Sequence, residues 1–184
     1  NGIEIAEGMC ALVERDTGIK ANNVVVASTG VIGQPLSLEP IDLGMKALCE
    51  GRDNSEDAAN AAAEAIMTTD TRLKQIAAEA EIGGAKIKIG GMAKGSGMIN
   101  PNMATMLSFI TTDAAISPEM LQKALSEDIK DTYNQISVDG DTSTNDTVAI
   151  MANGLAGNAE INADGPEFAV FCEALNMVTT DLAK

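Results

Sequence analysis

Residues 74–89, with the sequence KQIAAEAEIGGAKIKI, predict a β-hairpin. Apolar and charged residues alternate on both sides of Gly83 and Gly84. A period of two is typical of a strand that buries one face. Two adjacent glycines between such runs favour a tight turn, because glycine adopts the positive φ angles that hairpin turns require. We therefore expect two antiparallel strands joined at Gly83 and Gly84.

The segments on either side of this hairpin predict further helices and strands in alternation. We expect helices over residues 5–17, after Pro40, over 55–65, from Ser117 with Pro118 in the first turn, and from about Pro166. We expect strands over residues 23–27, 105–112 and 148–151, and an irregular glycine-rich segment over residues 90–104. Strands and helices that alternate around a hairpin predict a layered α/β (α+β) fold, with a mixed β-sheet packed between helices.

The composition excludes several kinds of chemistry. The chain has 184 residues, with 12 Lys and Arg against 27 Asp and Glu, a net charge of −15 and no His. Without an imidazole, neither a Ser-His-Asp nor a Cys-His catalytic group can form. An acidic surface repels phosphates, and an aromatic content of 2% leaves little on which bases can stack. We therefore expect no nucleic-acid partner.

Length and cysteine usage bound the setting of the chain. A chain of 184 residues with 45% hydrophobic residues is typical of a single globular domain. No apolar run approaches the ~20 residues that a membrane span needs, so we expect no membrane partner. Cys10, Cys49 and Cys172 are far apart and odd in number, which favours a reducing compartment. Because the chain begins at Asn1, we interpret residues 1–184 as an internal part of a longer precursor.

An acidic turn over residues 139–146 resembles the start of a calcium loop. The sixth position of that loop needs Gly and the twelfth needs Glu, and these positions hold Thr144 and Ile150. We therefore expect a hydrogen-bonded turn and no metal site, and a non-enzymatic cation-binding domain remains an alternative.

The junction PNMATML, residues 101–107, carries the chemistry that the missing His cannot provide. If the Ala104–Thr105 bond is cut, Thr105 holds a hydroxyl nucleophile and an α-amine on one residue. An α-amine has a reference pKa of ~7.7–8.0, so near neutrality it can act as the base. The oxyanion that forms in such reactions needs fixed donors, and the turn at Thr29 and Gly30 offers a hydroxyl and a backbone N–H.

Four segments together closely resemble the ornithine acetyltransferase family, also called bifunctional glutamate N-acetyltransferase. They are VASTGVIG (26–33), IMTTDT (66–71), GGMAKGSGMI with PNMATML (90–107) and VDGDTSTNDT (138–147). The four matches occur in the order of the family and are spread along the chain from residue 26 to residue 147.

The resemblance implies a precursor that cuts itself at Ala104–Thr105. Residues 1–104 then belong to an α chain and residues 105–184 to a β chain. Thr105 is the nucleophile that carries the acetyl group, and Thr29 and Gly30 form the oxyanion hole.

The resemblance also implies that Thr68, with Thr69 as the close alternative, Lys94 and Thr105 contact substrate. Acetyl passes from N2-acetylornithine to Thr105 and then to glutamate, in arginine biosynthesis, and some members also accept acetyl-CoA. No cofactor is required, and the usual assembly is an α2β2 heterotetramer in the cytoplasm. Members are longer than this chain, and part of their substrate pocket lies beyond Lys184. A self-processed aminopeptidase or amidase, with water as the acceptor, is the alternative enzyme.

Overall fold

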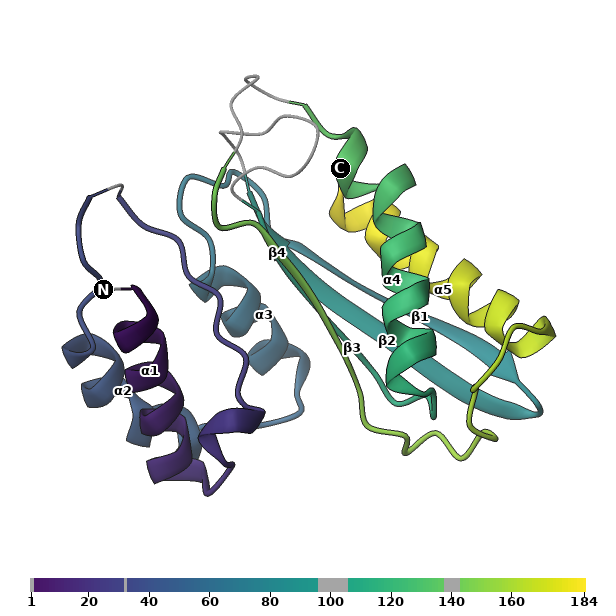
Figure 1. The fold of residues 1–184 in the computed structure, drawn as a ribbon, viewed down its shortest axis with the longest axis horizontal. Coiled ribbons are helices and arrows are strands. Elements are labelled where there is room, and N and C mark those ends of the chain that lie inside the picture. The colour runs from purple at the N-terminus through teal and green to yellow at the C-terminus, as the bar shows by residue number, and fades with distance from the viewer. Residues whose placement is uncertain (1, 32, 96–105, 138–142) are drawn as a thin grey trace. The chain divides into compact units, whose positions relative to one another are not determined.

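A computed structural model of the chain describes residues 2–31, 33–95, 106–137 and 143–184 (Figure 1). The chain divides into two compact units, Asn1–Ala59 and Asn60–Lys184. The first four elements are α1 (Gly2–Thr17), the 3-10 helix η1 (Ala21–Asn23), α2 (Glu39–Glu50) and α3 (Glu56–Ala65). They are followed by β1 (Lys74–Ile82), β2 (Ala85–Lys94), β3 (Leu107–Thr112), α4 (Pro118–Asp131), the 3-10 helix η2 (Tyr133–Gln135), β4 (Thr147–Ala152) and α5 (Pro166–Leu182).

Helix α1 ends where the sequence predicted. The hydroxyl of Thr17 donates to the Val13 carbonyl over 2.6 Å, and Gly18 follows with a φ of +76°. That positive φ is the left-handed conformation that commonly closes a helix. The predicted helices after Pro40 and over residues 55–65 are also confirmed, as α2 and α3.

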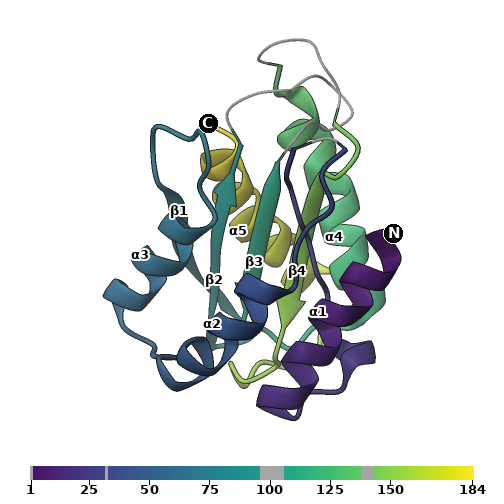
Figure 2. The ribbon, with the colours of Figure 1, turned by 90° about the vertical axis from the view of Figure 1, so that its left-hand side faces the viewer.

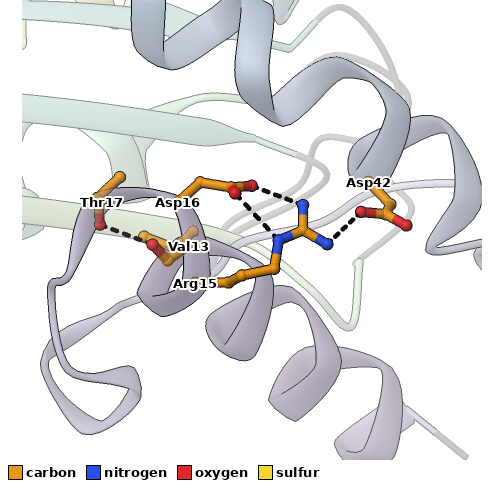
Figure 3. Close-up of polar contacts among 5 residues, drawn as sticks. All are labelled: Val13, Arg15, Asp16, Thr17 and Asp42. Atoms are coloured by element: carbon orange, nitrogen blue, oxygen red, sulfur yellow. Dashed lines mark hydrogen bonds and ion pairs between the residues drawn. The ribbon is translucent and has the colours of Figure 1, made fainter.

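An arginine joins α1 to α2 on the surface of the first unit (Figure 3). Arg15 donates from Nε and Nη2 to the two carboxylate oxygens of Asp16, over 3.0 and 2.6 Å. Its Nη1 donates to Asp42 of α2 over 2.5 Å. The hydrogen bonds from Arg15 lower the pKa of Asp16. Because these groups lie at the surface, the ion pairs contribute little to stability, and only the pair of Arg15 with Asp42 links the two helices.

The strand predicted over residues 23–27 is wrong. The backbone turns through η1 and is extended at Val24, with φ −103° and ψ 128°, but forms no ladder with any described strand. The side chain of Val25 is 73% exposed. β-Branched residues favour an extended backbone locally, whereas a strand also needs a partner in space.

The predicted hairpin is confirmed as β1 and β2, which pair antiparallel along their full length. Gly83 and Gly84 have φ angles of +59° and +83°, as a two-residue turn with positive φ at both positions requires.

Strand β2 continues to Lys94, so the prediction of an irregular segment from residue 90 is wrong for its first five residues. Gly91 pairs with Ile76 on one side and Ile110 on the other, and both neighbours fix the backbone of β2. A Cβ on Gly91 would lie only 2.8 Å from Cδ1 of Leu182, the last residue of α5. Glycine at this position therefore lets the end of α5 approach the sheet.

The sheet has the order β1-β2-β3-β4, which can be followed across Figure 2. β2 and β3 are antiparallel, and β3 and β4 are parallel, so the sheet is mixed, as predicted. The strand predicted from Thr105 begins at Leu107, and Thr105 itself lies outside the described residues.

Helices α4 and α5 cover one face of this sheet (Figure 1). Helix α4 begins as predicted, with the Ser117 hydroxyl accepting the Met120 N–H over 3.3 Å. Between helices and sheet lies the hydrophobic core, whose largest fully buried apolar side chains are Ile82, Ile87, Ile89, Ile110, Phe171, Leu175, Val178 and Leu182. The layered α/β fold class is confirmed.

Candidate active site

The predicted cleavage bond and nucleophile, Ala104 and Thr105, lie outside the described residues. The geometry of the candidate site therefore rests on the residues on either side. Thr29 and Gly30 belong to the first compact unit, where Thr29 is half-buried and Gly30 is exposed. Thr68 and Lys94 belong to the second unit.

Met106 is the first described residue after the predicted cleavage bond. It is buried, and both its backbone N–H and its carbonyl form hydrogen bonds. The Met106 N–H donates to Oδ1 of Asp146 over 2.7 Å, and its carbonyl accepts the N–H of Thr147 over 2.9 Å. Parallel pairing of β3 with β4 then starts at Leu107 opposite Thr147. The residue that follows Thr105 in sequence is thus anchored to the start of β4.

The carboxyl group of Asp146 is only partly satisfied. Its Oδ2 is buried and accepts no hydrogen bond from the described residues. Burial raises the pKa of Asp146, against the opposing effects of the hydrogen bond from Met106 and of the nearby Ser143 hydroxyl. The sequence motif around residues 138–147 gave Asp146 no role, and the structure places it next to the candidate site.

Lys94 is the last residue of β2 and is only 3% exposed. In the sheet it pairs with Leu107, so it lies beside the strand that follows the predicted cleavage bond. A buried ammonium group is costly unless an opposite charge or hydrogen bonds compensate it. Asp70 is close enough for electrostatic attraction to Lys94.

Asp70 connects two predicted substrate contacts. Its Oδ1 accepts the N–H of Gly95 over 2.6 Å, and its Oδ2 accepts the N–H of Thr68 over 3.2 Å. Burial acts to raise the pKa of Asp70, but these two backbone donors and the charge of Lys94 together bring it below its ordinary value. Asp70 is therefore held as a carboxylate between the loop of Thr68 and the end of β2.

A second lysine completes this group. Lys74, the first residue of β1, donates from Nζ to the carbonyl of Gly95 over 3.0 Å. Both backbone polar groups of Gly95 are thus held by charged side chains, the N–H by Asp70 and the carbonyl by Lys74. Thr68 and Thr69 are exposed at the same end of the hairpin. The cationic side chain of Lys94 can bind the carboxylate of a small ligand.

The structure thus brings Thr68 and Lys94 together through Asp70, a residue that the sequence analysis did not single out. Asp70 lies inside the quoted segment 66–71, and Lys74 follows it closely. A charged residue directly after two candidate substrate-binding threonines was the available signal. The sequence alone does not show that Asp70 bonds across 25 residues to Gly95.

Comparison with known proteins identifies the family of this chain. The family model of the ArgJ family matches residues 1–184. The chain belongs to the ArgJ family. This match confirms the predicted resemblance to the ornithine acetyltransferase family, which is also called bifunctional glutamate N-acetyltransferase.

Curated ArgJ-family relatives are about 50% identical in sequence to this chain. The chain is 49% identical over 183 residues to the arginine biosynthesis bifunctional protein ArgJ of Oceanobacillus iheyensis, covering 100% of this chain and 44% of that protein. It is 54% identical over 166 residues to the protein of the same name from Lactococcus lactis, covering 90% of this chain and 41% of that protein. The chain thus spans less than half the length of these relatives.

A solved structure of an ArgJ-family protein is also similar. The crystal structure of arginine biosynthesis bifunctional protein argJ from Bacillus halodurans is 54% identical, with a TM-score of 0.42, over 44% of this chain and 38% of that one.

Among the described residues of this ArgJ-family chain, no helix is both long and apolar enough to cross a membrane. No group of three or more His, Cys, Asp or Glu among them is arranged to hold a metal ion, and residues 138–142 of the acidic turn are not among the described residues. The three cysteines are free thiols.

Proposed function

We propose that the protein moves acetyl from N2-acetylornithine to glutamate through an acetyl-Thr105 intermediate. The observation that supports this most is the match to the ArgJ family along the whole chain. The curated relatives carry the name arginine biosynthesis bifunctional protein, which fits acetyl transfer in that pathway. Because the chain spans less than half of those relatives, tests of function need the complete natural polypeptide that contains this chain, the whole protein.

Self-cleavage comes first in the proposal. The hydroxyl oxygen of Thr105 attacks the carbonyl carbon of Ala104, and the bond from that carbon to the Thr105 nitrogen breaks. Water then hydrolyses the resulting ester. The products are a carboxylate on Ala104 and a Thr105 with a free α-amine and a free hydroxyl.

Acetyl transfer uses the freed residue. The α-amine of Thr105 takes the hydroxyl proton while the oxygen attacks the acetyl carbonyl of N2-acetylornithine. The proton then goes to the departing ornithine nitrogen, and the acetyl group stays on Thr105 as an ester. The amine of glutamate attacks this ester in the second half-reaction, which restores the hydroxyl. Thr29 and Gly30 are assigned to the oxyanion of both steps, as hydroxyl and backbone N–H donors.

Substrate binding is assigned to Thr68 and Lys94, with Thr69 as the alternative to Thr68. N2-acetylornithine and glutamate share an α-carboxylate, and the buried ammonium of Lys94 is a suitable partner for it. One carboxylate site for donor and acceptor fits a ping-pong reaction, because the two substrates then occupy the same place in turn. The hydrogen bonds of Asp70 to Thr68 and Gly95 support the placement of both contacts in one site.

The remaining assignments follow the same proposal. We assign no cofactor, an α2β2 heterotetramer of the two processed chains, and the cytoplasm, for which three free cysteines are the expected state. Acetyl-CoA is a further acetyl donor to test beside N2-acetylornithine.

Intact-mass measurement of the whole protein tests self-cleavage. We expect two fragments separated between Ala104 and Thr105, and one uncut polypeptide for Thr105→Ala. Thr105→Ser keeps a hydroxyl and is the matched control, so it still cleaves. An active enzyme that consists only of uncut polypeptide contradicts the proposal.

Incubation with N2-acetylornithine alone tests the intermediate. We expect one acetyl group on Thr105 by peptide mass spectrometry, and its loss when glutamate is added. Acetyl on another residue argues against Thr105 as nucleophile. Release of free acetate at the same rate with and without glutamate favours the aminopeptidase or amidase alternative.

A further inference from the structure

Asp70 joins two segments of the second unit that are far apart in sequence. Its carboxylate accepts the N–H of Thr68, two residues earlier, and the N–H of Gly95, 25 residues later. Each oxygen takes one of these bonds, at 3.2 Å from Thr68 and 2.6 Å from Gly95. A charged acceptor with a backbone donor forms a stronger hydrogen bond than a neutral pair.

Gly95, the residue after Lys94, is also held by a second side chain. Lys74 Nζ donates to the Gly95 carbonyl over 3.0 Å. The N–H and the carbonyl of Gly95 belong to two successive peptide groups, so Asp70 and Lys74 together restrain the peptide groups on both sides of this residue. Lys94, buried one position earlier, is therefore held at the end of β2.

We propose that Asp70 is a positioning residue for substrate binding, which holds Thr68 and Lys94 at a fixed separation by bonding the backbone N–H of Thr68 and that of Gly95, the residue after Lys94. This inference rests on the proposed function, because it gives Thr68 and Lys94 a common ligand. Asp70 acts through these two residues, and both of its oxygens are occupied by backbone N–H groups. Lys74 has the same role on the carbonyl side of Gly95.

Positioning and direct contact with substrate predict different kinetics. The α-carboxylate is common to N2-acetylornithine and glutamate, so disturbing the site that binds it raises both KM values together. Direct contact of Asp70 with the side-chain ammonium of N2-acetylornithine would instead affect that substrate alone, since glutamate has no such group.

Steady-state kinetics of the whole protein with Asp70→Ala and Asp70→Asn is the first test. For Asp70→Ala we expect both KM values to rise about tenfold or more by a common factor, with a smaller change in kcat. Asn keeps an acceptor for one of the two N–H groups, so Asp70→Asn lies between wild type and Asp70→Ala. Lys74→Met provides a second route to the same effect, because it releases the Gly95 carbonyl and leaves Asp70 in place.

Asp113→Ala is the matched control. Asp113 is also half-buried, and its Oδ1 accepts the Lys88 N–H over 2.7 Å, which is the same kind of bond to β2. Lys88 lies six residues before Lys94, roughly 20 Å along an extended strand. Asp113→Ala therefore removes a comparable hydrogen bond, and both KM values are expected to stay at the wild-type level.

Amide hydrogen exchange is the second test and does not depend on turnover. The amides of Thr68 and Gly95 are expected to exchange faster in Asp70→Ala than in wild type, and at the wild-type rate in Asp113→Ala. Unchanged exchange in Asp70→Ala, unchanged KM values, or a rise confined to N2-acetylornithine overturns the positioning role. Faster exchange in Asp70→Ala, together with a wild-type protein that transfers no acetyl, would instead sink the proposed function and leave the hydrogen-bonded link in place.

Discussion

The carboxylate of Asp146 accepts the backbone N–H of Met106 over 2.7 Å and so fixes the residue that follows Thr105 in sequence. The two partners are 40 residues apart, and the bond lies where β3 and β4 begin their parallel pairing. Asp146 is thus an anchor for the backbone on one side of the proposed cleavage site.

Removal of this anchor is expected to destabilise the protein. Asp146→Ala leaves the buried Met106 N–H without its acceptor, at a cost of ~1–3 kcal/mol in the free energy of unfolding. Asp146→Asn keeps an oxygen acceptor and is expected to cost less. Urea unfolding of the whole protein measures both, with Asp164→Ala as the control, since Asp164 forms an exposed ion pair with Lys123. Equal stabilities for all three variants would show that the Met106 contact contributes nothing.

The same carboxyl group has a pH signature. Its pKa is raised by burial, so the folded state binds the proton of Asp146 more tightly than the unfolded state. The contribution of protonated Asp146 to the stability of wild type is fully present below the pKa that Asp146 has in the unfolded chain. It is lost as pH rises through the pKa of Asp146 in the folded state. The stability of Asp146→Asn relative to wild type is therefore expected to increase as pH rises through the acidic range.

Two adjacent glycines of β2 provide a matched pair of packing variants. A Cβ on Gly91 would lie 2.8 Å from Leu182 and 3.3 Å from Ile110, whereas a Cβ on Gly90 meets nothing closer than 3.8 Å. Gly91→Ala is expected to cost ~1–3 kcal/mol by overpacking, and Gly90→Ala less than ~1 kcal/mol. Thermal unfolding of the two variants of the whole protein decides this, and equal losses would count against close packing of α5 at Gly91.

The sequence pattern correctly predicted those helices and strands whose formation depends on neighbouring residues in the chain. The hairpin over residues 74–89 follows from alternation around two glycines, and Ser117 with Pro118 marks the start of α4. The two wrong predictions concern segments whose structure depends on pairing with residues far away in the sequence. Residues 23–27 have strand-forming side chains without a ladder, and Gly90 and Gly91 stay in a strand because neighbours on both sides pair with them.

The candidate site divides in the same way. Thr68 and Lys94 were predicted through a family resemblance, which the family match confirms as a resemblance and which leaves their roles to experiment. Asp70, Lys74 and Asp146 were missed, because each acts through a hydrogen bond to backbone 21 to 40 residues away. No spacing rule along the chain encodes such a bond.

Lys94 provides the most direct test of carboxylate binding. Lys94→Met keeps much of the apolar stem and removes the cation, and we expect kcat/KM to fall about 10- to 100-fold for both substrates. Lys86 lies on the same strand, but it is exposed and paired with Glu79, so Lys86→Met is the control and should leave kcat/KM unchanged. Wild-type kinetics in Lys94→Met would remove Lys94 from the site.

A buried pair of hydroxyl groups, on Ser108 of β3 and Tyr133 of η2, predicts how the stability of the protein changes at alkaline pH. Ser108 Oγ and Tyr133 Oη lie 2.8 Å apart, and both side chains are almost fully buried. Burial, with a smaller effect from Asp128, raises the pKa of Tyr133 to about 12 from its ordinary value of 10.0, although the bond with Ser108 acts in the opposite direction. The folded state therefore keeps the phenol proton at pH values where the unfolded chain has lost it.

The sign of this effect separates Tyr133→Phe from wild type. The raised pKa gives wild type a contribution that is full below pH ~10 and falls by at most ~2–3 kcal/mol as pH rises to ~12. At pH 7 Tyr133→Phe is expected to be less stable by ~1 kcal/mol, because the Ser108 hydroxyl loses its partner. The difference should shrink and then reverse between those two pH values in urea unfolding of the whole protein. Ser108→Ala also breaks the bond but keeps the phenol, so it retains the alkaline loss. Parallel stability curves for wild type and Tyr133→Phe from pH 8 to pH 12 would contradict a buried, neutral Tyr133.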